Sequence, residues 1–312
     1  MTFSENLKEF SGKKVVDHEL GKKFRSPDKK APRLRLDYGD EHSTGDLLED
    51  LLANSAADQL TALVIGSWGQ YMYESPQSAA NVIEALTAAA PHLPNLTSLC
   101  FGDITYRECE ISWIMQTDVS PLWSAFPKLE HFQVRGGNGL SLGTLELGRL
   151  RTLVVESGGL PQSVVRQVAS SSLPALEHLE LYLGTYEYGG YREVVEDLKP
   201  ILSGEMFPRL RYLGLRNSEF ADKVALAVVQ SPLLERIETL DLSLGTLGDE
   251  GAGALAACPA VAQLKRLDVH HHYISAEGVQ GLKALPVQLD ASGREPDDEY
   301  KGEIYRYVAI GE

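Results

Sequence analysis

The chain has 312 residues, of which 43% are hydrophobic, 23% charged and 8% aromatic. This composition is typical of a folded protein and excludes a disordered, collagen-like or low-complexity chain. The formal net charge is −15, which disfavours binding to nucleic-acid phosphates and to anionic lipid surfaces. A common domain size of about 150 residues would predict two domains, but the repeats described below predict one continuous unit.

The three cysteines, Cys100, Cys109 and Cys258, form no CxxC motif, so we expect neither a disulfide framework nor a thiolate zinc site. The first residues lack the apolar core of a signal peptide. No run approaches the about 20 apolar residues of a membrane span. We therefore expect a cytoplasmic protein with no membrane contact, no nucleic-acid partner and no cofactor.

Residues 1–58 are expected to cap the N-terminal end of the molecule. The first 35 residues hold ten Lys and Arg against five Asp and Glu, which is a charge of +5, and they include a basic segment over 22–30. Leu34 and Leu36 alternate with arginines, as a first, degenerate strand would. GDLLEDLLANSAAD, residues 45–58, follows with the apolar spacing of an amphipathic helix.

Residues 59–285 repeat a short pattern of aliphatic residues. In eight segments an aliphatic residue is followed by apolar residues three and five positions later, and these segments are LTALVI, LTSLCF, LEHFQV, LRTLVV, LEHLEL, LRYLGL, IETLDL and LKRLDV. A Gly or another small residue usually stands eight positions after the first aliphatic residue. This is the L-x-x-L-x-L pattern of leucine-rich repeats.

Segments between these strands have the spacing of helices, for example SVVRQVASS, DKVALAVVQS and AEGVQGLKAL. One strand and one helix cannot bury a core, whereas stacked copies bury a continuous one. The sequence therefore predicts an α/β fold, a horseshoe-shaped leucine-rich-repeat solenoid with parallel strands on the concave face and helices on the convex face. The 21-residue step from Leu129 to Leu150 leaves room only for an irregular loop.

The segment 102–126, GDITYRECEISWIMQTDVSPLWSAF, interrupts the regular repeats. It places Asp103, Glu108 and Trp113 directly after a strand, where the loops of a parallel sheet reach its carboxyl edge. One interpretation is a long return helix whose aromatic residues fill the core. The other is an exposed loop that contacts a partner.

Residues two, four and six positions after the first aliphatic residue are expected to point to the concave side, because side chains alternate along a strand. They mix arginine, tyrosine and acidic residues, as protein-recognition surfaces do. We predict partner contacts at Arg135, Glu156, Tyr182, Arg216, Asp241, Asp268 and His270. The same register displays Cys100 on the concave side, but no base is dedicated to it, which argues against a nucleophile.

Three consecutive histidines raise the alternative of a metal site. Alternation along a strand prevents all three from binding one ion, so such a site would use His270, His272 and Asp268, ligands that suit zinc or iron. The other interpretation is that His272 packs in the turn while its neighbours are displayed. The motifs GxSxG, GxxxxGK[ST] and HExxH do not occur.

Residues 286–312 are expected to cap the C-terminal end. PVQLD fits a last strand, REPDDEY a charged loop, and IYRYVAI an edge strand or a mobile tail because its apolar residues alternate.

The chain resembles a family of bacterial leucine-rich-repeat proteins that have ribonuclease-inhibitor-like repeats and no assigned function. The motifs that carry the resemblance include GDITYRECEISWI, LDLSLGTLGDEG and LDVHHHYIS, and it covers most of residues 50–285. The resemblance implies an accessory role in a bacterial biosynthetic or modification gene cluster. It implies no catalytic residue, and it favours residues 102–113 and 270–272 as contact sites.

We predict a non-enzymatic, monomeric scaffold that binds a protein or peptide, first through the concave residues and second through the loop with Asp103, Glu108 and Trp113. The alternative is a metal-dependent enzyme or accessory factor that uses the region from His270 to His272. A third interpretation is a structural subunit that assembles through its exposed end strands.

Overall fold

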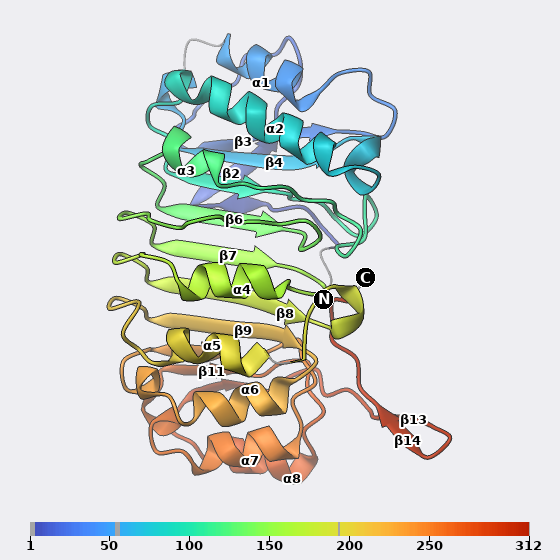
Figure 1. Ribbon diagram of the computed structural model, residues 1–312, viewed down its shortest axis with the longest axis vertical. Helices are drawn as coiled ribbons and strands as arrows, with labels where there is room; N and C mark the ends of the chain where they lie inside the picture. The colour runs from blue at the N-terminus through green and yellow to red at the C-terminus, as the bar shows by residue number, and fades with distance from the viewer. Residues whose placement is uncertain (1–3, 54–56, 193, 312) are drawn as a thin grey trace.

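Strands and helices form two layers in the computed structural model of this chain (Figure 1). The structure describes residues 4–53, 57–192 and 194–311. Twelve strands make one sheet whose spatial order follows the sequence order, and a separate two-stranded sheet lies near the C-terminus. In Figure 1 the helices lie in front of the sheet, and the labelled strands of the repeats point to the same side.

Eight strands occupy the eight positions that the repeat pattern predicts. They are β4 (Ala62–Trp68), β5 (Ser98–Phe101), β6 (His131–Arg135), β7 (Thr152–Glu156), β8 (His178–Gly184), β9 (Tyr212–Ser218), β10 (Thr239–Asp241) and β11 (Arg266–Asp268). All pair in parallel, with equivalent repeat positions side by side, such as Leu213, Leu240 and Leu267. These aliphatic side chains are buried. The predicted leucine-rich-repeat solenoid is confirmed.

Return segments form the helical layer. Its helices are α2 (Pro76–Ala89), α4 (Gln162–Ala169), α5 (Val194–Leu202), α6 (Ala221–Val228), α7 (Asp249–Ala257) and α8 (Ala276–Lys283). Short 3-10 helices are η1 (Ala57–Gln59), η2 (Gln70–Tyr73), η3 (Ala90–His92), η4 (Tyr186–Tyr188), η5 (Pro232–Glu235) and η6 (Val261–Gln263). Each repeat alone would leave its apolar face exposed, so stacking builds one continuous core. Among the described residues no helix has the length and apolar character to cross a membrane.

The N-terminal residues build the first strands of the same sheet. β1 (Glu9–Phe10) pairs antiparallel with β2 (Lys13–Asp17), and β2 pairs in parallel with β3 (Lys30–Leu36). β3 confirms the strand predicted from Leu34 and Leu36, and it pairs with β4. The N-terminal segment therefore extends the sheet of the repeats.

The helix predicted over 45–58 is α1 (Thr44–Leu52), which is shorter than predicted. It begins at Ser43, whose hydroxyl accepts a hydrogen bond from the Asp46 N–H while the Asp46 carboxylate accepts one from the Ser43 N–H. This capping box satisfies two donors at the start of the helix. Part of the predicted helix, residues 54–56, lies outside the described residues.

The long return helix considered for 102–126 is wrong. In this stretch the structure has one short helix, α3 (Pro121–Ala125), and residues 102–120 run as a loop held to the next return by single bridges at Met115 and Asp118. The Asp118 carboxylate accepts a hydrogen bond from the Ser120 N–H at 3.0 Å. This Asx turn offers the backbone an alternative to helical hydrogen bonds. The core-filling part of the interpretation holds for Trp123, which is buried and donates to the Leu142 carbonyl at 2.8 Å. Residues 136–150 form the irregular return that the short spacing predicts.

β12 (Gln288–Asp290) is the predicted last strand and pairs in parallel with β11. The chain then leaves the sheet and forms a hairpin of β13 (Asp298–Tyr300) and β14 (Glu303–Tyr305), which projects from the body in Figure 1. The edge strand predicted in IYRYVAI is limited to Ile304 and Tyr305. Residues 307–311, the C-terminal tail, instead lie along the ends of the strands, as described below.

Candidate functional site

The carboxyl edge of the sheet, defined here as the ends of the parallel strands and the loops that leave them, collects the polar residues that the sequence singled out. The longest loop without a regular helix follows β5 and contains Asp103, Glu108 and Trp113. Parallel strands end at one edge, so this loop lies beside the ends of β3, β4 and β6. The geometry of the site starts from its two acidic residues.

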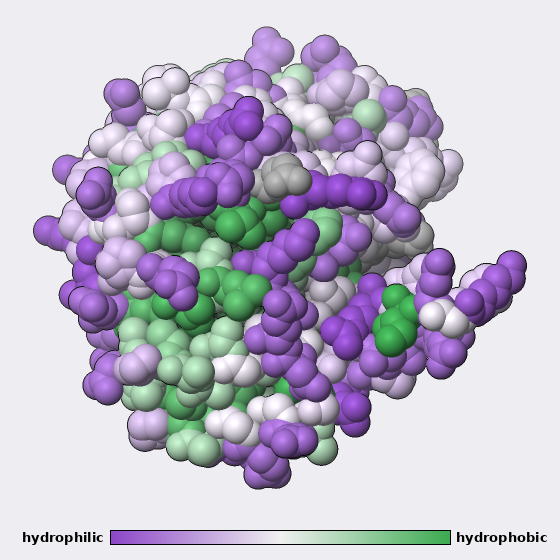
Figure 2. Space-filling view, turned by 60° about the horizontal axis from the view of Figure 1, so that its bottom comes forward, coloured by the Kyte–Doolittle hydropathy of each residue, from purple (hydrophilic) through white to green (hydrophobic). Residues whose placement is uncertain are grey.

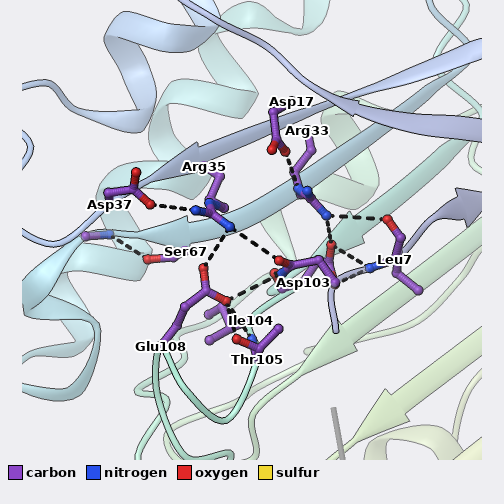
Figure 3. A network of polar contacts seen from close by, with 12 residues as sticks. Leu7, Asp17, Arg33, Arg35, Asp37, Ser67, Asp103, Ile104, Thr105 and Glu108 are labelled. Atoms are coloured by element: carbon purple, nitrogen blue, oxygen red, sulfur yellow. Dashed lines mark hydrogen bonds and ion pairs between the residues drawn. The ribbon is translucent and has the colours of Figure 1, made fainter. Parts of the chain in front are cut away.

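Asp103 is fully buried and links three parts of the chain (Figure 3). Both carboxylate oxygens accept from the Leu7 N–H at 3.1 Å, and one accepts from Arg33 Nη1 at 2.9 Å. The Arg135 guanidinium lies 4.0 Å away. Asp103 therefore holds the N-terminal segment against β3 and β6, and it is not available to a partner in this conformation.

Glu108 folds the loop back on itself. Its carboxylate accepts from the Thr105 N–H at 2.7 Å and from the Thr105 hydroxyl at 2.8 Å, while Arg35 Nη1 lies 3.6 Å away on β3 (Figure 3). Two local hydrogen bonds and an ion pair fix the turn. Trp113, a few residues further on, is 60% exposed.

Arg135 and Glu156 form a buried ion pair on the concave side. Arg135 Nε donates to Glu156 Oε2 at 2.7 Å, and Arg135 Nη1 donates to the Ile104 carbonyl at 2.5 Å. Burial raises the pKa of Glu156 even though Arg135 lies beside it. The register placed this pair correctly, on neighbouring strands, but both side chains are covered and serve the loop after β5.

Arg216 is the centre of a second polar cluster. Its guanidinium donates to the Tyr182 hydroxyl at 2.8 Å and to Glu180, and it lies 3.3 Å from an Asp241 oxygen. The Tyr212 hydroxyl donates to the same Asp241 oxygen at 2.6 Å. Tyr182 and Asp241 are buried, so the structure groups three predicted contact residues but uses them within the chain.

Asp268 and His270 lie at the C-terminal end of the concave surface. Asp268 Oδ1 lies 2.7 Å from His270 Nδ1, and Asp268, His270 and Asp290 together offer ligand atoms within 4.8 Å of one another. The Arg266 guanidinium, however, lies 2.7 Å from Asp268 and 3.7 Å from Asp290. Burial alone would raise the pKa of Asp268, but hydrogen bonds from His270 and Arg266 lower it to about 2. The cation between these carboxylates is an arginine of the chain itself.

His272 does not join this group. Its side chain is fully buried, with Nε2 3.1 Å from the Ala291 carbonyl and Nδ1 accepting from the Ile274 N–H at 3.0 Å. Both ring nitrogens are therefore engaged in the turn, as the packing interpretation predicts. The ligand set of His270, His272 and Asp268 is not brought together.

The N-terminal segment covers part of the concave face, which the register did not predict. Phe10 joins an apolar cluster with Val64 and Cys100, and its ring lies 4.6 Å from that of His131. Cys100 is 1% exposed rather than displayed, and burial raises its pKa well above the ordinary value. The concave face over β4–β6 is therefore occupied by the chain's own first strand.

Exposed aromatic side chains gather elsewhere. Among the described residues eleven large apolar or aromatic side chains are exposed, and ten of them follow the end of a strand or lie in the C-terminal hairpin region: Leu20, Tyr38, Tyr73, Tyr106, Trp113, Tyr186, Tyr300, Ile304, Tyr305 and Tyr307. The eleventh, Leu226, is on helix α6. Six of the eleven therefore lie at the carboxyl edge, and four lie in the region of the C-terminal hairpin.

Three comparisons bear on the family. No family model matches the sequence, and no curated protein sequence matches it. Among solved structures, a crystal structure of a Bacteroides fragilis protein is 31% identical, with a TM-score of 0.79 over 89% of this chain and 76% of that one. This chain belongs to the family of that Bacteroides fragilis protein.

Two other solved structures are less similar to this chain. An internalin from Listeria monocytogenes is 17% identical, with a TM-score of 0.40 over 80% of this chain and 57% of that chain. A leucine-rich-repeat protein from Leptospira interrogans is 15% identical, with a TM-score of 0.33 over 80% of this chain and 50% of that chain.

Sequence reasoning missed the tyrosines at the N-terminal end of the carboxyl edge. Tyr38, 81% exposed, and Tyr73, 41% exposed, line a cavity of about 310 Å³ together with Met72, Arg107 and Glu108. Each tyrosine follows the end of a strand, β3 or β4. The available signal was an aromatic residue shortly after the end of β3 and of β4, at positions that the concave register does not include.

Proposed function

We propose that this chain is a non-catalytic leucine-rich-repeat scaffold that binds a protein or peptide through the carboxyl edge of its sheet. The observation that carries the proposal is the concentration of exposed aromatic side chains at that edge, with Tyr38, Tyr73, Tyr106 and Trp113 around the loop after β5. Aromatic side chains that lose exposed area on binding are the usual anchors of protein interfaces.

The chemistry of the buried residues supports a binding role over a catalytic one. Ion pairs and hydrogen bonds within the chain engage Asp103, Arg135 and Glu156 and hold the loop in its shape. Cys100 is buried, and its raised pKa favours the thiol over the nucleophilic thiolate. These residues hold the edge in place, and in the proposal the exposed aromatic residues make the contacts.

Of the predicted concave contact residues, the proposal keeps Arg216 and His270. Arg216 and His270 keep part of their side chains accessible, with 15% and 20% exposed, so they extend the contact surface from the edge onto the C-terminal half of the concave face. A cytoplasmic location fits three free thiols. The accessory role in a bacterial biosynthetic or modification gene cluster stays a prediction of the sequence resemblance.

The test uses exposed positions, because reversing the charge of buried Arg135 would strand Glu156 and Asp103 and damage the fold. A tagged chain is recovered from its native host, its partner is identified by mass spectrometry, and affinities are measured with the purified partner. We expect Trp113→Ala to weaken binding about tenfold to a hundredfold, in the range of interface anchors. The melting temperature of Trp113→Ala should equal that of the wild type.

The matched control is Leu226→Ala, which removes a 38% exposed apolar side chain from the convex helix α6. It should leave the affinity unchanged. Equal affinity of Trp113→Ala, Tyr73→Ala and the wild type for the purified partner would refute the carboxyl edge as the contact surface.

A further inference from the structure

The C-terminal hairpin is built without a buried face. Its turn is formed by Lys301 and Gly302, both with positive φ (54° and 83°), which is the two-residue turn that matches the twist of paired strands. All six strand residues are exposed, including Tyr300 at 61% and Ile304 at 64%. An isolated two-stranded hairpin is marginally stable in water, so this one depends on how its ends are held.

Both ends of the hairpin are anchored to the solenoid. Before β13, the Glu295 N–H donates to the His272 carbonyl at 2.8 Å. After β14, Arg306 Nε donates to Asp297 at 2.6 Å and closes the base, while the Arg306 guanidinium lies 5.3 Å from the Tyr273 ring centre. The hairpin is therefore a short arm on a fixed base.

The tail that follows is held by a ladder of strained residues. Asn217, Leu244 and His271 stand at the same position of three successive repeats, and all have positive φ (54°, 67° and 55°). Each contacts the C-terminal tail: Asn217 bonds both backbone groups of Ile310, the Leu244 carbonyl accepts from Ala309, and His271 Nε2 lies 3.2 Å from the Tyr307 carbonyl. Because the strained residues of three successive repeats all bond the tail, we infer that the tail is held in a fixed position along these repeats.

A cleft of about 640 Å³ lies between the arm and the solenoid. Its lining includes three acidic residues, Glu219, Asp222 and Glu250, the apolar side chains of Phe220 and Ile304, and two basic residues, Lys223 and Arg306. The hairpin residues in this lining all come from β14 and the residue after it. Figure 2 shows the arm standing away from the body, with a hydrophobic side chain exposed among hydrophilic ones.

The strand register leaves one backbone position of β14 unpaired within the hairpin. Tyr300 pairs with Glu303 next to the turn, and Glu299 pairs with Ile304. In an antiparallel hairpin these pairs alternate between hydrogen-bonded and non-hydrogen-bonded, starting with a bonded pair beside a two-residue turn. The N–H and C=O of Ile304 therefore point away from β13, on the strand that lines the cleft.

We propose that this cleft binds an extended segment of a partner protein with alternating basic and apolar side chains, which adds to β14 as a third strand. Strand addition supplies backbone hydrogen bonds, and alternate side chains give specificity. Basic residues would meet Glu250 and the carboxylates of Glu219 and Asp222, each of which also accepts backbone hydrogen bonds through one of its oxygens. Apolar residues would meet Phe220 and Ile304. A second copy of this chain fits less well because the arm itself is acidic, with Asp297, Asp298, Glu299 and Glu303 against Lys301 and Arg306.

The inference rests on the proposed role in protein binding but uses a surface separate from Trp113. The probe is a short synthetic peptide of alternating lysine and valine, and its binding to the full chain is measured by fluorescence anisotropy. Ile304→Ser and Glu250→Lys should each weaken binding about tenfold, because they remove the apolar contact and reverse a facing charge. A glutamate–valine peptide should not bind, and N-methylation of the lysine–valine peptide should weaken binding by removing its backbone donors.

Control variants separate the two surfaces. Leu226→Ser on α6 and Trp113→Ala should bind the peptide as the wild type does, whereas replacement of residues 298–305 by a short glycine linker should abolish binding. Hydrogen exchange at the Ile304 amide should slow when the peptide binds. Unchanged binding by the linker variant, or no slowing at Ile304, would overturn the assignment while leaving the proposed function intact. Dimerisation that is lost in the linker variant would assign the cleft to a second copy and would also overturn it.

Discussion

At the scale of single residues, most charged side chains that the sequence assigned to the concave face or to the loop after β5 are buried. Asp103, Arg135, Glu156, Glu180, Asp241 and Asp268 are all less than 9% exposed, and all take part in ion pairs within the chain. Removing one member of such a pair leaves its partner charged and buried, which typically costs about 3–5 kcal/mol. These residues therefore fix the geometry of the loops at the carboxyl edge more than they offer free contacts.

Asn217, near the end of β9, holds the C-terminal tail through its side chain. Its side chain is fully buried, donates to the Ile310 carbonyl at 2.6 Å and accepts from the Ile310 N–H at 3.0 Å. We expect Asn217→Ala to lower the free energy of unfolding by about 2–4 kcal/mol, because it loses these bonds and a further one to the Ser157 carbonyl at 3.3 Å, and puts alanine at positive φ. Asn217→Gly loses the same bonds without the strain, so it should cost about 1 kcal/mol less. Urea unfolding measures both values, and equal costs would show that backbone strain contributes nothing at this position.

The sequence predicted which residues share a strand position but not which of them are exposed. Side-chain alternation placed Arg135 beside Glu156 and Tyr182 beside Arg216, and the strand pairs confirm both placements. The N-terminal cover is a contact of another kind: the Leu7 N–H bonds Asp103, 96 residues further along the chain, and Phe10 packs with Cys100. Periodicity carries no signal for a contact of that kind, since it describes only the repeat itself.

At the scale of elements, the hairpin of β1 and β2 behaves as a cover over the concave face. Phe10 fits an apolar patch made by Ala62, Val64 and Cys100. The Ser11 hydroxyl lies 2.9 Å from His131 Nδ1, and His131 Nε2 is buried without a hydrogen-bond partner among the described residues. The cover is thus held partly by a histidine that must stay neutral.

This arrangement predicts a pH-dependent stability. Burial, with a smaller contribution from His178, lowers the pKa of His131 to about 4, whereas an unfolded histidine has a pKa of about 6.5. Below that value the unfolded chain binds a proton that the folded chain does not, so stability is full above pH 6.5 and is lost as the pH falls toward 4. The pKa difference corresponds to a loss of about 2–3 kcal/mol at the acid end of this range.

The measurement compares urea unfolding at pH 7 and pH 5 for the wild type and His131→Gln. The variant should lose a large part of the difference between the two pH values, because glutamine does not titrate, while His272, whose pKa is also lowered by burial, should keep the remainder. His92→Gln is the matched control, since His92 is an exposed residue in η3. A wild-type slope retained in full by His131→Gln would show that another group controls the acid sensitivity.

Element prediction succeeded where a periodic pattern was present and failed where local turns replaced it. The strand at Leu267 and the helix over Ala276–Lys283 were predicted because their apolar residues recur at fixed spacing. The loop after β5 has no such spacing, and its shape comes from the Glu108 and Asp118 turns and the buried Asp103. A helix prediction there counted apolar residues and missed the side chains that compete for backbone hydrogens.

At the scale of the whole molecule, the tail ties together repeats that otherwise touch only their neighbours. Solenoid stability is approximately a sum of repeat and nearest-neighbour terms. Ile310, 2% exposed, bonds Asn217 near the end of β9, Ala309 bonds Leu244 after β10, and Tyr307 bonds Tyr273 after β11. One segment thus spans three successive repeats and adds contacts that a simple array lacks.

Truncation after Arg306, which removes residues 307–312, tests this coupling. We expect amide hydrogens over 212–219, 239–246 and 266–273 to exchange about tenfold faster or more, because local opening of these repeats no longer requires the tail to detach, and a tenfold change corresponds to about 1.4 kcal/mol. Amides of β4 and β5 should keep their rates, since solenoid contacts are local. The matched control is the glycine-linker replacement of residues 298–305, which removes the arm but keeps the tail and should leave all these rates unchanged. Faster exchange in both variants would assign the effect to the arm, and uniform acceleration along the whole chain would mean that the repeats unfold as a single unit.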